Sequence, residues 1–459
     1  MNINLRKHID QIKNGGLIVL IKKLRSAFYL LIQLPFYLFS IPLLIIIYLL
    51  RPWLLIRWYG LPCGRIGHLA LDAELYSCRR DAKINQPSQK YIDFFFLEHR
   101  YICNRQLVKM QRRSITILPA FLMVPLSNTN RFINLCIKGK VKSDSGKKSL
   151  GGQHEIDIFV QKSFYKIIMP KSSPHISFNE EEKLKGKTIL NEFGIPENAK
   201  FVCLIVRDSA YLARHKIETL HNFSYHNYRD CDIDNFVLAA EELAARGYYV
   251  FRMGIKVHKP LKSSNPKIID YANSKMRSDF MDIYLGANCT FCISTALGYD
   301  AIPSIFRKPV AYIYTPVGIA QLQAENDLAI CKHHLNKKTK KKLTISEIFS
   351  SNVVIGLSSA EYENNNVELQ ENTPEEIKDL VTEMDERISG SWKETEEDLL
   401  LQKKFWHIFE GYMKKLIILE PENQYHRVFS QLRVTYDIKK NTNTKFSSKF
   451  LKNNLDFIQ

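Results

Sequence analysis

The stretch KFVCLIV (200–206) is a continuous apolar run bounded by polar residues, which is typical of a parallel strand buried on both faces. Four more short runs follow, at 248–254 (YYVFRMG), 267–270 (KIID), 289–294 (CTFCIS) and 309–314 (PVAYIY). Helical patterns separate them. Strands that alternate with helices indicate an α/β fold with a doubly wound parallel sheet.

Residues at the ends of the intervening segments support these helices. Gly247 follows the helical pattern at 233–246 and suits the position just after a helix end. Ser278 precedes the pattern at 279–288 as a candidate N-cap. The stretch TPEE (373–376) combines an N-cap, a first-turn proline and a capping-box glutamate, so it predicts the start of a further helix.

Length and charge limit the classes of function. The 459 residues suffice for several domains, and 45% hydrophobic residues exclude wholesale disorder. The formal net charge of +18 favours anionic partners, namely phosphorylated small molecules, nucleic acid or a membrane surface.

The N-terminal region predicts membrane association. No charged residue occurs from 27 to 50, and basic residues lie on both sides of this run. Twenty-four helical residues could cross a hydrocarbon core of about 30 Å. Pro35 and Pro42 favour kinks, so we expect residues 1–60 to enter the cytoplasmic leaflet and leave on the same side. A single span and a buried soluble helix are the alternatives.

Nine cysteines, an odd number, indicate a reducing compartment rather than a disulfide framework. Only Cys289 and Cys292 form a CxxC, and no second pair at ligand spacing accompanies them. We therefore expect buried thiols on a core strand and no zinc.

Polar residues follow the predicted strands at the edge where open α/β sheets bind ligands. These candidate binding residues are Arg207, Asp208, Arg252, Asp270, Ser294, Thr295 and Gly298. Arginines beside a Ser/Thr/Gly turn that opens a helix suit a diphosphate. The alternatives are structural: an ion pair for Arg207, a helix cap at Ser294 and Thr295, and a strand-end role for Asp270.

Neither GxxxxGK[ST] nor GxGxxG occurs, which disfavours a P-loop NTPase and a common dinucleotide dehydrogenase. We expect no cofactor and a metal-independent mechanism, in which protein cations stabilise a leaving diphosphate.

Several stretches together resemble a bacterial family of glycosyltransferases that are encoded among surface-polysaccharide genes. They are RIGHLALDAELY (65–76), VRDSAYL (206–212), HNYRD (226–230), RMGIKV (252–257), IIDYANSKMRSDFMDIYLGANCTFCISTALG (268–298) and RKPVAYIY (307–314). The family is similar to enzymes of the GT-B fold, in which two Rossmann-like domains face each other across a cleft. Residues 207–208 also resemble, over a short stretch, the arginine motif of fucosyltransferases.

The resemblance implies that an acceptor-side domain and a nucleotide-sugar domain are braced by the terminal helices. The apolar runs at 93–97 and 114–118 predict strands in the acceptor-side domain. With the membrane-associated segment and a polar tail, the chain divides into five regions. Their predicted bounds are 1–60, 61–185, 186–370, 371–418 and 419–459. Gly67 would turn the chain at the cleft and place His68 near an acceptor hydroxyl. His68 and Asp208 are the rival general bases, and Arg229 joins the donor-binding residues.

The expected function is transfer of a sugar from a nucleotide-sugar donor to a growing cell-surface polysaccharide or a lipid-linked acceptor, at the cytoplasmic side of the inner membrane. Pyruvyl or phosphosugar transfer on the same fold is one alternative. A non-catalytic membrane scaffold or a nucleic-acid-binding protein is another, prompted by the lysine run at 337–342. That run lacks interleaved aromatic residues, so we expect no nucleic-acid partner.

Overall fold

The computed structural model describes the chain except for residues 1, 85, 100, 139–150, 159–168, 212–223, 315–325, 352, 354–357 and 420–443. The chain forms two compact units. The first comprises Met1–Cys63, Asn85–Tyr101 and Ile115–Val160, and the second comprises Gly64–Ile84, Ile102–Ser114 and Gln161–Gln459. The backbone therefore passes from one unit to the other at five points. The domain bounds expected from the sequence are continuous ranges, and they stay a prediction.

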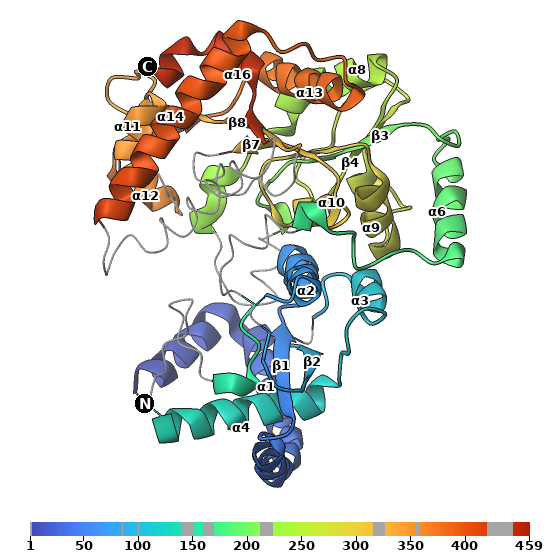
Figure 1. Cartoon of the computed structure of the whole chain (residues 1–459), viewed down its shortest axis with the longest axis vertical. Coiled ribbons are helices and arrows are strands. Elements are labelled where there is room, and N and C mark those ends of the chain that lie inside the picture. The colour runs from blue at the N-terminus through green and yellow to red at the C-terminus, as the bar shows by residue number, and fades with distance from the viewer. Residues whose placement is uncertain are drawn as a thin grey trace. The chain divides into compact units, whose positions relative to one another are not determined.

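The second unit is built on a seven-stranded parallel sheet, which confirms the expected α/β class (Figure 1). Its strand order is β11-β8-β7-β6-β3-β4-β5. The strands are β3 (Phe201–Ile205), β4 (Tyr249–Arg252), β5 (Ile268–Ile269), β6 (Cys292–Ser294), β7 (Val310–Tyr314), β8 (Leu328–Cys331) and β11 (Lys445–Phe446). Each of the five apolar runs that were expected to be strands contains one of the strands β3 to β7. A short antiparallel pair, β9 (His333–Asn336) with β10 (Val367–Gln370), lies apart from this sheet.

The order of the strands reverses between β3 and β6. From β3 the chain adds β4 and β5 on one side, and then returns to place β6, β7 and β8 on the other. Such a reversal is a topological switch point, where the connections leave in opposite directions and open a crevice at the carboxyl ends of the strands.

Helices cover both faces of this sheet, with α8 and α13 on one face and α9 and α10 on the other (Figure 1). The helices of the unit are α2 (Ile66–Asp81), α3 (Arg105–Gln111), α6 (Glu180–Glu192), α8 (Val237–Ala245), α9 (Asp279–Asn288), α10 (Ala301–Ile305), α11 (Ile345–Ser350), α12 (Ser359–Asn364), α13 (Pro374–Ser389), α14 (Glu396–Leu419) and α16 (Ser448–Asn453). The expected caps are confirmed: Gly247 has a positive φ of 94°, Ser278 accepts a hydrogen bond from the N–H of Met281, and Thr373 forms a capping box with Glu376.

The end of the chain departs from the expected polar tail. Lys445–Phe446 pairs with β8 as the edge strand, and α16 follows it. Phe446, Phe450 and Leu451 are buried. Two paired residues are too few to give a strand pattern in the sequence, so this element could not be expected.

Within its described residues, the first unit contains two parallel strands, β1 (Leu55–Leu61) and β2 (Tyr91–Leu97). Two helices, α1 (Asn2–Leu50) and α4 (Ala120–Lys138), accompany them. The strand expected at 114–118 is only an isolated bridge between Phe95 and Ile117. Trp58 is fully buried in the core of this unit.

Helix α1 stays helical through Pro35 and Pro42, and its backbone leaves helical geometry only at Gly16, where φ is 58°. Glycine adopts this conformation without the steric cost of a Cβ. The segment Ile32–Leu50 is long and apolar enough to cross a membrane, and only 22% of it is buried. Whether the helix enters and leaves on one side or spans stays a prediction.

Candidate functional site

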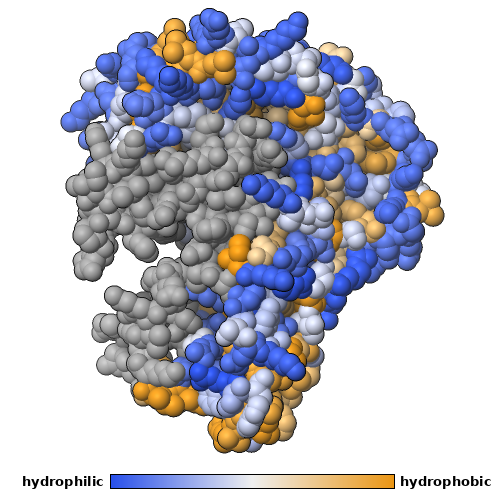
Figure 2. Space-filling view, viewed as in Figure 1, coloured by the Kyte–Doolittle hydropathy of each residue, from blue (hydrophilic) through white to orange (hydrophobic). Residues whose placement is uncertain are grey.

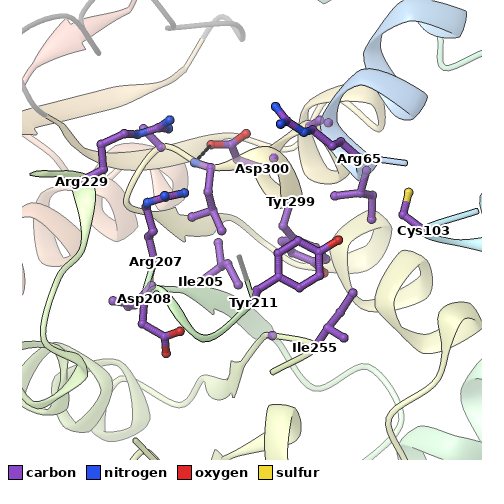
Figure 3. A pocket seen from close by; sticks show the side chains of 18 of the residues that line it. Arg65, Cys103, Ile205, Arg207, Asp208, Tyr211, Arg229, Ile255, Tyr299 and Asp300 are labelled. Atoms are coloured by element: carbon purple, nitrogen blue, oxygen red, sulfur yellow. Dashed lines mark hydrogen bonds between the residues drawn. The ribbon is translucent and has the colours of Figure 1, made fainter. Parts of the chain in front are cut away.

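A cavity of about 380 Å³ lies at the switch point, and every residue that lines it belongs to the second unit (Figure 3). The carboxyl end of β3 contributes Arg207 and Asp208, and the turn after β6 contributes residues 296–298. The first turn of α2 contributes Gly67 and His68. The structure thus brings together several residues that the sequence marked from distant segments.

One side of the cavity is cationic. Figure 3 shows the guanidinium groups of Arg207 and Arg229 close together, with Arg65 across from them. Burial lowers the pKa of Arg207, and the neighbouring charge of Arg229 lowers it further. Asp230 offsets part of this charge, with its Oδ1 3.0 Å from Nε of Arg207. The buried Nη2 of Arg207 has no hydrogen-bond partner among the described residues. Two adjacent guanidinium groups and an unused donor suit a bound anion.

The turn after β6 is held in a constrained shape. Ala296 has a φ of 58°, in the left-handed region that side chains other than glycine rarely adopt. The Ser294 hydroxyl donates to Asp300 at 3.0 Å, and Asp300 also accepts the N–H of Leu297 at 3.0 Å. Such strain persists only where the surroundings fix it, and it concentrates at functional sites.

Ser294 and Thr295 act within the protein rather than as ligands of the cavity. Both side chains are buried, and neither lines the cavity. The Thr295 hydroxyl accepts the backbone N–H of Arg207 at 2.8 Å, which ties the end of β6 to the end of β3. These hydrogen bonds position the turn, and the expected contact of the two residues with the donor stays a prediction.

Gly67 and Gly298 touch each other through their backbones. A Cβ on Gly67 would lie 3.0 Å from the Cα of Gly298, and a Cβ on Gly298 would lie 3.2 Å from the N of Gly67. Both distances are shorter than most Cβ contacts, so a side chain at either position would require the facing backbone to move. The N-terminal turn of α2, which has no side-chain cap at Arg65, thereby meets the turn after β6.

His68 lies half exposed at the cavity, one helical turn before the buried carboxylate of Asp72. The Nδ1 of His68 is 4.0 Å from Oδ1 of Asp72. The Asp72 carboxylate thus lies on the Nδ1 side of the ring, too far away for a hydrogen bond but close enough for its charge to act on the imidazole.

Both carboxylate oxygens of Asp208, the rival base, accept hydrogen bonds from backbone N–H groups. Its Oδ1 accepts the N–H of Ala210 and its Oδ2 accepts the N–H of His258, both at 2.9 Å. These bonds fix the loop after β3; Asp208 still lines the cavity, and its role as the rival base stays a prediction.

Arg252 and Asp270 lie outside the lining of the cavity. The side chain of Arg252 is 1% exposed, with Nη1 3.2 Å from Oδ1 of Asp270 and Nη2 3.0 Å from the carbonyl oxygen of Lys259. Arg252 pairs in register with Leu204, inside the sheet rather than beyond its edge. The structure shows these two residues as a buried ion pair outside the cavity lining, and donor binding by them stays a prediction.

Three residues that line the cavity, and one acidic motif, were not predicted from the sequence. Arg65, Tyr211 and Lys256 also line the cavity. The stretch DCDID (230–234) has the DxD spacing that can hold a divalent cation. In the structure Asp230 pairs with Arg207, whereas Asp232 and Asp234 both contact Nζ of Lys259, at 2.8 and 2.7 Å.

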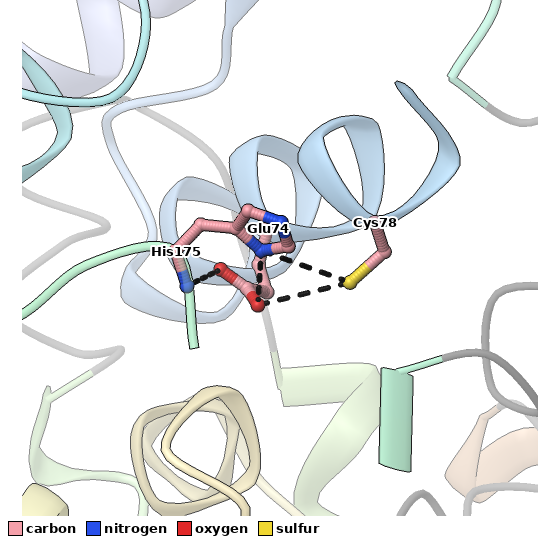
Figure 4. Close-up of side chains that lie close together, drawn as sticks. All are labelled: Glu74, Cys78 and His175. Carbon is pink, nitrogen blue, oxygen red and sulfur yellow. Dashed lines mark hydrogen bonds and ion pairs between the residues drawn. The ribbon is translucent and has the colours of Figure 1, made fainter. Parts of the chain in front are cut away.

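Within the described residues, one cluster has the donor types of a metal site: Glu74, Cys78 and His175 (Figure 4). The Glu74 carboxylate already forms an ion pair with Arg307, whose Nη2 lies 2.5 Å from Oε1. Contacts with Cys78 and Glu74 raise the pKa of His175 to about 10, so the imidazole is protonated near neutrality. Two cationic groups at the donor atoms oppose a metal ion, and the cluster is better described as a buried ion-pair network.

Cys289 and Cys292 are buried free thiols, as the sequence predicts. Burial raises the pKa of Cys292 far above its usual value, so it stays protonated.

No protein-family model and no curated protein matches the chain. Two solved structures are similar to it: the ADP-heptose lipopolysaccharide heptosyltransferase II of E. coli and a glycosyl transferase family 9 protein of Veillonella parvula. Each is 11% identical with a TM-score of 0.37; the matches cover 61% and 60% of this chain, and 90% and 85% of the other chains. Similarity at this level carries no argument about activity, and the family resemblance stays a prediction.

Proposed function

We propose that the chain is a glycosyltransferase that moves a sugar from a nucleotide-sugar donor to a hydroxyl group of a growing surface polysaccharide or a lipid-linked acceptor. The observation that carries this proposal is the pair Arg207 and Arg229 beside a constrained backbone turn at the switch point of a parallel sheet. Nucleotides bind doubly wound sheets at such points.

The arginine pair would bind the donor diphosphate. As the bond from the anomeric carbon to the diphosphate oxygen breaks, the leaving group takes the electron pair and gains negative charge. Preorganised cations stabilise that charge more in the transition state than in the ground state. The unused Nη2 of Arg207 supplies one donor, and N–H groups in the first turn of α2 supply others.

His68 would activate the acceptor. Its imidazole would take the proton of the acceptor hydroxyl while the acceptor oxygen forms the new bond to the anomeric carbon. The buried carboxylate of Asp72, 4.0 Å from Nδ1, would stabilise the resulting imidazolium through its charge.

The reaction would need no metal ion, because the arginine pair supplies the positive charge and lysine or arginine already neutralises Asp230, Asp232 and Asp234. Transfer from the correct donor should survive EDTA. Loss of activity in EDTA that Mn²⁺ restores would assign Asp230–Asp234 to a metal and contradict this part of the proposal.

We place the protein at the cytoplasmic side of the inner membrane, supported by the largely unburied apolar segment Ile32–Leu50. The basic surface does not favour nucleic acid. Lys337 and Lys340 form ion pairs with Glu363 and Glu368, and Lys332 is buried against backbone carbonyl groups.

A thermal-shift screen against UDP-, GDP-, CMP- and dTDP-sugars tests the proposal. One donor should raise the Tm in proportion to RT ln(1 + [L]/Kd), and Arg207→Ala should abolish this shift without lowering the ligand-free Tm. Arg246→Ala is the matched control, because Arg246 is also ion-paired but follows the end of α8, outside the cavity. If no nucleotide sugar shifts the Tm and phosphoenolpyruvate or a phosphosugar donor does, a different group transfer replaces this proposal.

A further inference from the structure

Helices α1 and α4 pack against each other through a seam that is polar over much of its length. Ser40 lies 2.8 Å from Thr129 between hydroxyl oxygens, the Tyr48 hydroxyl donates to Oδ1 of Asn130 at 2.6 Å, and Asn128 donates to the Tyr37 hydroxyl at 2.9 Å. Gln33, Ser40, Ser127 and Asn130 are all at most 4% exposed. Apolar contacts join the seam nearer the strands, where Leu44 and Ile47 meet Met123 and Leu126.

The outward faces of the same helices are apolar. On α4 the exposed large side chains are Phe121, Leu122, Phe132, Leu135 and Ile137. On α1 they include Leu34, Leu38, Phe39, Ile45, Ile46 and Leu49. Figure 2 shows hydrophobic surface at the lower end of the view, where Figure 1 places α1 and α4.

This arrangement inverts the pattern of a helix pair in water. A surface helix of a soluble protein turns its apolar stripe inward and its polar residues outward. Helices in lipid do the reverse, because hydrogen-bonding side chains hold neighbours together while apolar side chains meet the acyl chains. The charge of Arg131 on α4 is paired with Glu155, as a charge near lipid requires.

We propose that α4 is a second lipid-contacting helix, which binds the bilayer side by side with α1 through the outward face of Phe121, Phe132, Leu135 and Ile137. Its sequence contains SNTNR (127–131), so it does not stand out as a membrane segment without the structure. The inference rests on the membrane attachment proposed above and is independent of the transfer reaction.

The native thiol of Cys136 provides the probe. It is exposed on α4 between Leu135 and Ile137, whereas the other eight cysteines are buried. The full-length protein is labelled there with the fluorophore NBD and reconstituted in vesicles of phosphatidylethanolamine with a minority of phosphatidylglycerol. Lipids with spin labels on their acyl chains should quench the fluorophore, and aqueous iodide should not.

Two controls use a Cys136→Ser background. Leu184→Cys lies on α6 of the second unit, where Leu184 is 67% exposed, the same as Phe132, and should be quenched by iodide alone. Ile45→Cys reports on α1 and should be quenched by the spin-labelled lipid. Lipid quenching at Ile45→Cys with iodide quenching at Cys136 overturns the inference for α4 alone. Iodide quenching at both positions overturns the membrane attachment itself. A blue shift at Cys136 that depends on protein concentration and not on vesicles overturns the inference in favour of a second copy of the chain.

Discussion

His68 and Asp72 form the part of the candidate site that would act on the acceptor rather than on the donor. Their separation along α2 by four residues places both on one face, with the carboxylate buried behind the imidazole. The two halves of the proposed chemistry therefore depend on different residues and can be disabled separately.

Replacing His68 with glutamine should lower kcat by about 10²–10⁴, because the acceptor loses its base. The donor should still raise the Tm as in the wild type, since the arginine pair is intact. Asp72→Asn should lower kcat less. Steady-state kinetics with both substrates measure this. A wild-type kcat for a folded His68→Gln protein would remove His68 from the mechanism.

Gly298→Ala should disrupt the close contact between α2 and the turn after β6. The new Cβ would meet backbone atoms of Gly67 at 3.2 Å, and backbone yields less easily than a side chain. We expect a loss of about 1–3 kcal/mol in the free energy of unfolding and a weaker donor-induced shift. Gly411→Ala on α14 is the control, because nothing lies within 4 Å of its Cβ and alanine favours a helix. Equal urea midpoints for Gly298→Ala and the wild type would contradict the close approach.

His175 should make stability depend on pH in the alkaline range. Its folded pKa of about 10 exceeds the ordinary 6.5, so its contribution is complete below pH 6.5 and is lost as pH rises toward 10. The free energy of unfolding should fall by up to about 1.4 kcal/mol for each pH unit over this range. Glu74, Asp81 and Cys78 contact the ring, and Arg307 contacts Glu74 and Cys78. The comparison of the wild type with His175→Gln leaves all four residues in place.

Urea midpoints measured from pH 6 to pH 10 test this, as the difference between wild type and His175→Gln. The difference should shrink toward zero as pH rises. A difference that stays constant across the range would show that the proton on His175 contributes nothing to folding.

At the scale of residues, the sequence predicted where the candidate site lies, but it did not predict which side chains line the cavity and which are buried in the protein. The strand-end rule places Arg207, Asp208 and Gly298 at one sheet edge, which the structure confirms. It cannot tell a side chain beyond the edge from one inside the sheet, and so it misplaces Arg252. It also cannot show that the Thr295 hydroxyl accepts a hydrogen bond from the backbone N–H of Arg207.

At the scale of elements, the edge strand β11 and helix α16 close one side of the sheet. Phe450 is 2% exposed and packs against Phe446 and Phe457 with ring centroids 5.5 and 5.7 Å apart. The Ser447 hydroxyl donates to the buried carboxylate of Glu383, which ties this end to α13.

Phe450→Ala should therefore destabilise the protein by about 3–5 kcal/mol, through lost burial and the cavity left behind. Leu455→Ala, five residues further along the chain but 51% exposed, should change the free energy of unfolding little. Urea denaturation of both variants measures the difference. Similar midpoints would mean that residues 444–459 do not belong to the folded core.

Long apolar runs and capping residues predicted the elements of the sheet well, because β3 and β7 are buried on both faces and α9 and α13 begin at strong N-caps. Elements fixed mainly by distant pairing escaped prediction. Residues 114–118 have a strand-like composition but find a partner only at Ile117, whereas Lys445–Phe446 has almost no pattern and pairs fully.

At the scale of the whole molecule, the sequence indicated more than one folded region and an apolar N-terminus. It suggested boundaries that fall between consecutive ranges, because composition changes along the chain are the only signal available. The two compact units instead interleave, with α2 and α3 in the unit of the large sheet and β1 and β2 in the other. Interleaving depends on contacts between distant residues, which a single sequence does not display.

The five passages of the backbone between the units have a practical consequence for cloning. Removing residues 1–60 takes β1 away from β2 and uncovers the face of α4 that packs on α1, so the shortened gene would yield an aggregating product. A stop codon cannot isolate the sheet-bearing unit either, because Gly64–Ile84 and Ile102–Ser114 come from the first quarter of the gene. A protein that is soluble without detergent is better obtained from the full-length chain. The exposed apolar residues on the outward faces of α4 (Phe132, Leu135 and Ile137) and of α1 would be replaced by polar residues.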